Sequence, residues 1–123
     1  MINILIDMPV YQPSLDLLKQ MKGINVELIT EPKEKVRSLP SMMIKDCNIL
    51  FCTFPPENHK EMKHLKLIQI ASAGYNQLIG LGLQQRGVKA CNALGVFDVP
   101  IAEWNIAMMI NLRRDLRAMI RNQ

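Results

Sequence analysis

The feature that most constrains the fold is the alternation of short apolar runs with segments of helical or turn character. Five runs have the aliphatic, β-branched composition that is typical of β-strands. We expect these strands at residues 2–6, 24–30, 48–53, 66–71 and 88–91. We expect helices or turns at residues 13–21, 39–44, 57–64 and 76–86, and a long helix at residues 100–122.

Strands that alternate with helices form right-handed βαβ units, which build an open parallel sheet with helices on both faces. The sequence therefore predicts an α/β fold with a flavodoxin-like strand order, 2-1-3-4-5, followed by a long C-terminal helix. Ligands of such sheets bind beyond the carboxyl ends of the strands. In this chain those ends lie near Asp7, Thr53, Ser72 and Asn92.

Length and composition fit one domain with a core, since the chain has 123 residues and 49% of them are hydrophobic. No run approaches the roughly 20 apolar residues that a membrane span needs, so we expect no membrane partner. The first residues lack the basic start and the cleavage site of a signal peptide. We therefore expect a cytoplasmic protein whose cysteines, Cys47, Cys52 and Cys91, are reduced and buried.

Charge gives no reason to expect a nucleic-acid partner. The net charge is +4, and only 5% of the residues are aromatic. Much of the excess lies in Arg113, Arg114, Arg117 and Arg121. No nucleic-acid-binding module accompanies it. His59 and His64 lie among charged residues, which predicts a solvent-facing helix, and no cluster has the spacing of a zinc site.

A candidate anion site follows the fourth apolar run, at Ser72, Ala73 and Gly74. A glycine after a strand lets the backbone turn and approach a ligand, and successive backbone N–H groups in such a turn bind anions. Asn92 ends the next run and could orient a substrate or hold the adjacent loop. The alternative is an ordinary strand-to-helix turn with Asn76 as the N-cap.

The long helix contains a carboxylate, Glu103, that we place in its first turn, where the helix dipole alone explains it. After Asn111 the helix becomes amphipathic, with an apolar stripe of Leu112, Leu116, Met119 and Ile120. Gly80 and Gly82 imitate a dinucleotide-binding fingerprint, but they do not lie between a strand and a helix, so we reject a cofactor site there.

Two segments carry a resemblance to a known family. They are Leu65–Leu78, LKLIQIASAGYNQL, and Gly87–Leu116, GVKACNALGVFDVPIAEWNIAMMINLRRDL. Together they resemble the N-terminal domain of the D-isomer-specific 2-hydroxyacid dehydrogenases, which include D-3-phosphoglycerate, glyoxylate/hydroxypyruvate and formate dehydrogenases. The linked pattern is S-A-G at residues 72–74, then N-x-x-G at residues 92–95, then A-E on a helix at residues 102–103.

The resemblance implies a flavodoxin-like substrate domain joined to a Rossmann domain that binds NAD or NADP. It implies that Ser72, Ala73 and Gly74 bind the carboxylate of a small 2-hydroxy or 2-keto acid through backbone N–H groups, with Asn92 close by. It also implies a hinge at the start of the long helix, at Pro100 and Glu103, and places Ile106 near the nicotinamide ring.

The family's glycine-rich NAD loop and its catalytic Arg, Glu and His lie further along that pattern, and no residue of this chain matches them. We therefore expect a substrate domain at residues 1–99 and a hinge helix at residues 100–123, truncated before the Rossmann domain. Alone, such a chain should bind no cofactor, contain no catalytic residue and be inactive. The complete enzyme is expected to be a homodimer, and the particular 2-hydroxy acid stays open.

The alternative is a stand-alone flavodoxin-like binding or signalling module that self-associates through its C-terminal helix. A response-regulator receiver would need a phosphorylatable aspartate at the end of the third strand, where Thr53-Phe54-Pro55 stands. A flavodoxin would need a hydroxyl-rich loop after the first strand, where Met8-Pro9-Val10-Tyr11 stands.

Overall fold

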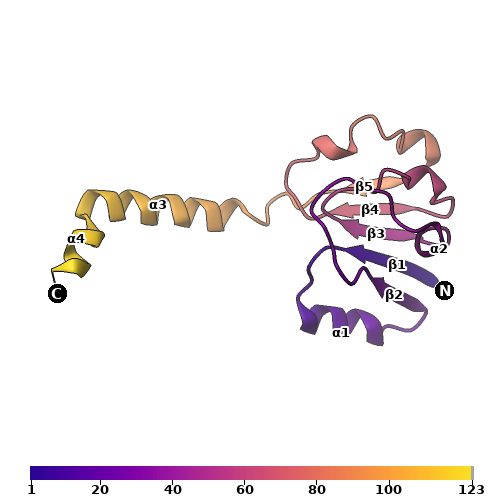
Figure 1. Cartoon of the computed structure of the whole chain (residues 1–123), viewed down its shortest axis with the longest axis horizontal. Helices are drawn as coiled ribbons and strands as arrows, with labels where there is room; N and C mark the ends of the chain where they lie inside the picture. The colour runs from indigo at the N-terminus through magenta and orange to yellow at the C-terminus, as the bar shows by residue number, and fades with distance from the viewer. Residues whose placement is uncertain (123) are drawn as a thin grey trace. The chain divides into compact units, whose positions relative to one another are not determined.

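The computed structural model describes residues 1–122 and shows an α/β fold with a five-stranded, all-parallel sheet (Figure 1). The strand order β2-β1-β3-β4-β5 confirms the flavodoxin-like order that the sequence predicts. The strands are β1 (Ile2–Asp7), β2 (Ile24–Leu28), β3 (Ile49–Cys52), β4 (Leu67–Ile70) and β5 (Lys89–Cys91).

Helices and short 3₁₀ turns connect the strands. The helices are α1 (Gln12–Gln20), α2 (Ser41–Ile44), α3 (Asp98–Arg114) and α4 (Leu116–Arg121). The 3₁₀ turns are η1 (His59–Glu61), η2 (Asn76–Leu78) and η3 (Gln84–Arg86). The predicted helix at residues 57–64 was wrong, because only the three residues of η1 are helical there.

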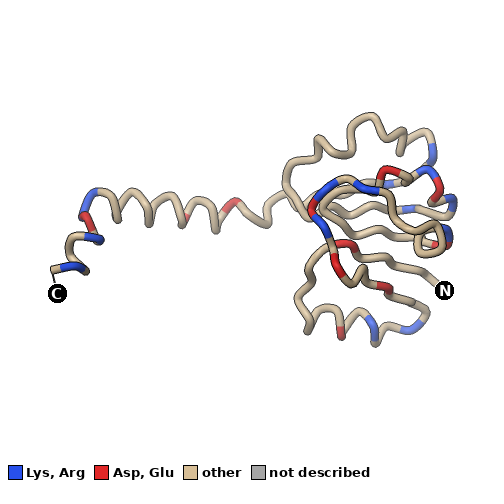
Figure 2. Tube along the Cα trace, viewed as in Figure 1, with Lys and Arg blue, Asp and Glu red and all other residues tan. Residues whose placement is uncertain are grey.

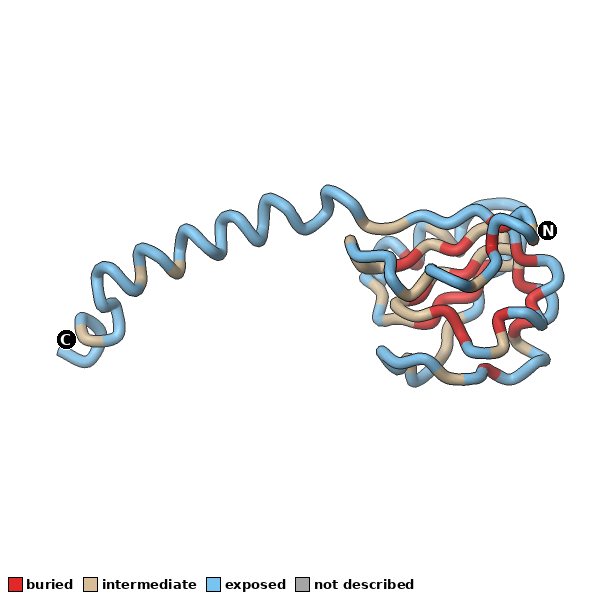
Figure 3. The backbone as a smooth tube through the Cα atoms, turned by 90° about the horizontal axis from the view of Figure 1, so that it is seen from above, coloured by how far each residue is buried: buried red, intermediate tan, exposed pale blue. Residues whose placement is uncertain are grey.

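The sheet has an apolar cluster on each face, because successive side chains of a strand point to opposite faces. On one face Leu5, Leu50 and Ile68 pack with Ile44 of α2 and with Met62, which follows η1. On the other face, Ile4 and Ile6 of β1 pack against Leu15 of α1. Helices therefore cover both faces, and the buried residues concentrate in the sheet (Figure 3).

Two of the three cysteines belong to this core as free thiols. Cys47 and Cys52 are buried, whereas Cys91 is exposed on β5, so the prediction of three buried cysteines was wrong for Cys91. Burial raises the pKa of Cys47 to about 11 and that of Cys52 to about 12. Both thiols therefore stay protonated at neutral pH and are poor nucleophiles.

The chain divides into two compact units, residues 1–93 and the residues from 94 on. The second unit begins its first helix at Asp98, two residues before the predicted start at Pro100. The predicted long C-terminal helix is present as α3, but it ends at Arg114 rather than near residue 122, because Asp115 is left-handed with φ 47° and ψ 57°. Its carboxylate accepts a hydrogen bond from the N–H of Ala118, 3.2 Å away, and so caps α4.

The helices α3 and α4 contain no buried residue among those described (Figure 3). No helix formed by residues 1–122 combines the length and the apolar character that crossing a membrane requires.

The sequence predicts that His59 lies on a solvent-facing helix, and this prediction was wrong. The residue is only 5% exposed, and Arg86 of η3 donates from Nη1 to its Nδ1 across 3.1 Å. Arg86 also donates from Nη2 to the carbonyl of Met62, 2.9 Å away. Burial first, and then the positive charges of Arg86 and Lys60, lower the pKa of His59. A neutral imidazole therefore ties η1 to η3.

This bond predicts a loss of stability in mild acid. Because the folded pKa of His59 is lowered, the unfolded chain binds a proton more readily as the pH falls below its unfolded value of about 6.5. The free energy of unfolding from urea titrations should stay constant from pH 7.5 to about pH 6.5 and decrease from there to pH 5.5. His59→Gln keeps an acceptor for Arg86 and should flatten this decrease.

The matched control is His64→Gln, because His64 is an exposed histidine only five residues away. It should leave the decrease as it is in the natural sequence. Equal effects of the two substitutions would contradict the role given to His59.

Candidate functional site

The two segments singled out in the sequence meet at the carboxyl ends of β4 and β5. The Asn92 side chain donates from Nδ2 to the carbonyl of Ala73 across 2.7 Å. The N–H of Ala93 donates to the carbonyl of Ser72 across 3.0 Å. The sheet brings them together because β4 and β5 are parallel neighbours whose ends meet at one edge.

A second set of hydrogen bonds fixes the turn after β4. Ser72 donates from Oγ to the carbonyl of Gly74, 2.8 Å away. Gln77 of η2 donates from Nε2 to Ser72 Oγ across 2.8 Å and to the carbonyl of Thr53 across 3.0 Å. The turn is thus attached to the end of β3, its neighbour on the other side.

Gln69 supports the same edge from within β4. Its Nε2 donates to the carbonyl of Asn92 across 3.1 Å and to that of Ile70 across 2.9 Å. The bond to Asn92 holds the backbone from which the Asn92 side chain reaches Ala73. Gln69, Gln77 and Asn92 therefore form a set of amides, here called the amide set, around the turn.

The turn leaves main-chain donors free. Among residues 1–122, no acceptor pairs with the backbone N–H of Ala73 or of Gly74. Gly74 is exposed, and a Cβ added to it would meet nothing within 4 Å. No residue from 67 to 85 is charged (Figure 2). Attraction of an anion to this turn would therefore depend on backbone N–H groups.

The alternative of an ordinary N-capped helix start does not describe this turn. The cap position of η2 is Tyr75, and no side chain caps the turn there. Because η2 has only three residues, it also contributes little of the dipole that a longer helix would bring to an anion.

An ion pair that the sequence pattern does not indicate lies at the end of β1. Asp7 is buried, and Arg37 donates to its Oδ1 from Nη2 across 2.6 Å. Arg37 also donates from Nη1 to the carbonyl of Lys33 across 2.9 Å, so it ties the charged connection after β2 to the sheet. The charge of the Asp7 carboxylate is thereby balanced by the Arg37 guanidinium.

The remaining predicted site residues lie in the second unit, on α3. Pro100 is the third residue of that helix, a position that tolerates a missing N–H. Glu103 is its sixth residue, so its predicted place in the first turn was wrong, and Asp98 is the acid there. Ile106 is 58% exposed.

Gly80 and Gly82 do not form the phosphate-binding turn of a nicotinamide dinucleotide site. Gly80 and Gly82 both have positive φ, but they connect two 3₁₀ turns rather than a strand and a helix. A pyrophosphate site of the Rossmann type needs the start of a helix behind its glycines. In residues 1–122, no group of three or more His, Cys, Asp or Glu side chains is arranged to hold a metal ion.

Comparison with known proteins adds no family assignment. No family model matches the chain, and no curated protein matches it either.

Replacement of Gln77 tests whether the amide set fixes the turn. In Gln77→Glu, an ionised carboxylate cannot donate to Ser72 or Thr53, so the free energy of unfolding should fall by about 1 kcal/mol. Backbone amide chemical shifts in ¹H–¹⁵N spectra should change most at Ser72, Gly74 and Asn92. Gln84→Glu, at an exposed position of η3, is the matched control. Similar shift changes in both variants would contradict the role of Gln77.

Proposed function

We propose that residues 1–93 form the substrate-binding domain of an NAD(P)-dependent oxidoreductase, which transfers a hydride between the cofactor and a 2-hydroxy or 2-keto acid. The observation that carries this proposal is the 2.7 Å hydrogen bond from Asn92 to Ala73. It joins the two segments on which the resemblance to D-2-hydroxyacid dehydrogenases rests. It also leaves the N–H groups of Ala73 and Gly74 free, as binding of a carboxylate requires.

The task of this chain in the reaction is to hold one end of the substrate. A carboxylate accepts hydrogen bonds from the N–H groups of Ala73 and Gly74, and such charge-assisted bonds are stronger than neutral ones. Holding the carboxylate fixes the orientation of the neighbouring carbon, at which the reaction takes place. The amide set keeps the donors in place before the substrate arrives, so less ordering is needed on binding.

The cofactor belongs to another domain in this proposal, because Gly80 and Gly82 lie between two 3₁₀ turns rather than between a strand and a helix. NAD or NADP supplies the hydride chemistry, and a Rossmann domain holds it. Helix α3 serves as the hinge between the domains, with Pro100 and Glu103 near its start and Ile106 facing the nicotinamide side. Such an enzyme would be a homodimer in the cytoplasm.

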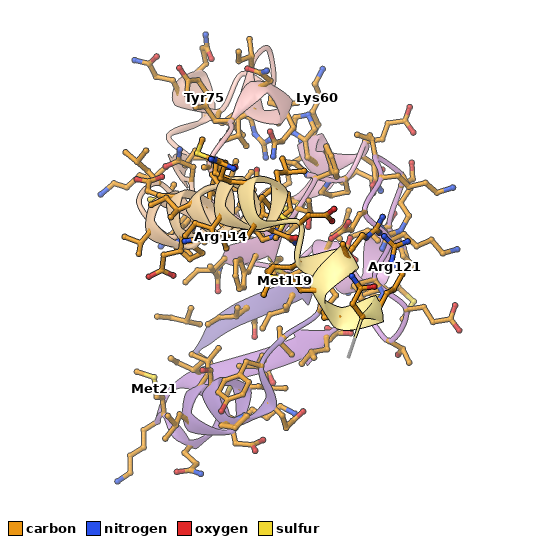
Figure 4. All side chains as sticks on the ribbon, turned by 90° about the vertical axis from the view of Figure 1, so that its left-hand side faces the viewer. Met21, Lys60, Tyr75, Arg114, Met119 and Arg121 are labelled. Carbon is orange, nitrogen blue, oxygen red and sulfur yellow. The ribbon has the colours of Figure 1, made fainter. Side chains whose placement is uncertain are left out.

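A second candidate function is self-association through the second unit. Its support is the exposure of large apolar side chains on α3 and α4, for example Leu112 at 84% and Ile120 at 72%. The Met119 and Arg121 side chains extend from α4 in Figure 4. Apolar patches of this kind favour association.

Replacement of Gly74 tests the carboxylate site. A Cβ at position 74 meets no atom within 4 Å, and φ there is not left-handed, so Gly74→Ala should leave the stability unchanged or slightly higher. Its methyl group enters the space given to the carboxylate. Binding of pyruvate, followed by amide shifts of Ala73, Gly74 and Asn92, should weaken about tenfold, which corresponds to ~1.4 kcal/mol.

The converse control is Gly87→Ala, because Gly87 has a φ of 68° and lies at the end of η3. It should lower the stability through backbone strain and leave pyruvate binding by the folded protein unchanged. The proposal fails if pyruvate causes no shift at the turn, or if both alanine variants bind it as the natural sequence does.

Self-association is tested by light scattering on the chain over a range of concentrations. The mean mass should rise with concentration, and Leu112→Glu should return it to the monomer value because a charge is costly in an apolar interface. Met42→Glu is the matched control, since Met42 of α2 is 83% exposed. A chain that stays monomeric at high concentration would refute this second candidate.

A further inference from the structure

An open groove of about 440 Å³ adjoins the proposed carboxylate site. The connection from η2 to η3 lines one side with Leu78, Ile79 and Leu83, and β5 lines the other with Ala90 and Cys91. Its volume lies in the range of roughly 300–1,000 Å³ that is usual for small-molecule sites. The groove belongs entirely to the first unit.

The groove and the carboxylate site share residues. Asn92, which holds the turn through Ala73, also lines the groove, and so does Tyr75, the residue after Gly74. The side chain of Tyr75 is 59% exposed and lies on the outside of the loop that contains η2 (Figure 4). A ligand held by its carboxylate at the turn therefore has this groove beside it.

The lining of the groove has no charged side chain. Leu, Ile, Ala, Cys, Tyr and Asn make up all of it, and no lysine, arginine, histidine or acid contributes. The nearest arginine in the sequence, Arg86, is engaged by His59 and Met62. A phosphate or a second carboxylate would find no cation there, whereas an alkyl group would lose contact with water at no polar cost.

We propose that this groove receives the side chain of the substrate and selects 2-hydroxy and 2-keto acids with an uncharged, apolar side chain over those with a phosphate or a second carboxylate. The inference rests on the proposed function, because it takes the carboxylate to be bound at Ser72–Gly74. The groove is the part that distinguishes among acids which all share that carboxylate.

Three 2-keto acids test the inference on the full chain: pyruvate, 4-methyl-2-oxopentanoate and 2-oxoglutarate. Amide shifts should show the same site at Ala73 and Gly74 for pyruvate and 4-methyl-2-oxopentanoate, with additional changes at Ile79 and Cys91 for the larger acid. The larger apolar acid should bind about tenfold more tightly than pyruvate, since each buried methylene favours binding. 2-Oxoglutarate should bind more weakly than pyruvate.

A charge introduced into the groove should reverse the preference. Ile79 is 68% exposed, so Ile79→Arg should not disturb the core, and it gives the groove a partner for a second carboxylate. In this variant 2-oxoglutarate should bind more tightly than 4-methyl-2-oxopentanoate. Leu17→Arg on α1 makes the same change in charge at a residue that is 67% exposed, and it should leave the original order.

The outcomes separate this inference from the proposed function. If the three acids bound at the turn with equal affinity and caused no amide shift at Ile79 or Cys91, the role of the groove in substrate selection would be refuted. That result would leave the proposed carboxylate site intact. If Leu17→Arg reversed the order of affinities as Ile79→Arg does, the role of the groove would also be refuted, because the added net charge would then explain the reversal. If none of the three acids bound, both the proposed function and the role of the groove in substrate selection would be refuted.

Discussion

The parallel pairing of β4 with β3 on one side and β5 on the other is the constraint on which the rest of the first unit depends. The register sets Cys52 beside Ile70 and Gln69 beside Cys91, so all three strands end at the same edge. Burial enforces this register, because Leu50, Cys52, Ile68 and Ile70 are fully enclosed on one face. A slip by one residue would turn these side chains to the opposite face.

Beyond the last paired residues of the strands, polar side chains at that edge form the hydrogen bonds that hold the backbone. The backbone beyond Ile70 has few ladder partners left, and three amide side chains supply hydrogen bonds to carbonyl groups instead. Carbonyl groups of the edge are thereby satisfied, while N–H groups of the turn stay available. An anion site needs this imbalance between satisfied acceptors and free donors.

The sequence predicts the sheet well because strand formation here depends on local apolar runs and on their alternation with helices. It predicts the neighbourhood of Ser72 and Asn92 for the same reason, since both follow strands that must pair. It fails where a contact is made by distant residues. Nothing in the pattern around Gln77 indicates its bond to Thr53, although a polar Gln69 inside an apolar run is a signal that could have been noticed.

The local sequence pattern also gives wrong predictions of exposure where a mostly charged segment contains one side chain that contacts a distant partner. The residues around His59 are mostly charged, yet its ring accepts a bond from Arg86, which lies 27 positions further on. The charged stretch before Ser38 likewise contains Arg37, whose partner Asp7 is 30 positions away. The break at Asp115 is local, but an aspartate is a modest helix former, and its left-handed backbone is visible only in the structure.

The free donors of the turn are main-chain groups, and this has a consequence for how such a protein can diverge. A recognition element made of peptide N–H groups keeps its chemistry when the side chains attached to it are exchanged, provided that the backbone path survives. Ala73 could change during evolution without loss of the proposed anion site, while replacements in the neighbouring groove, at Tyr75 for example, would redirect it to a new ligand. Descendants of one such protein could therefore share a site that residue identity no longer reveals.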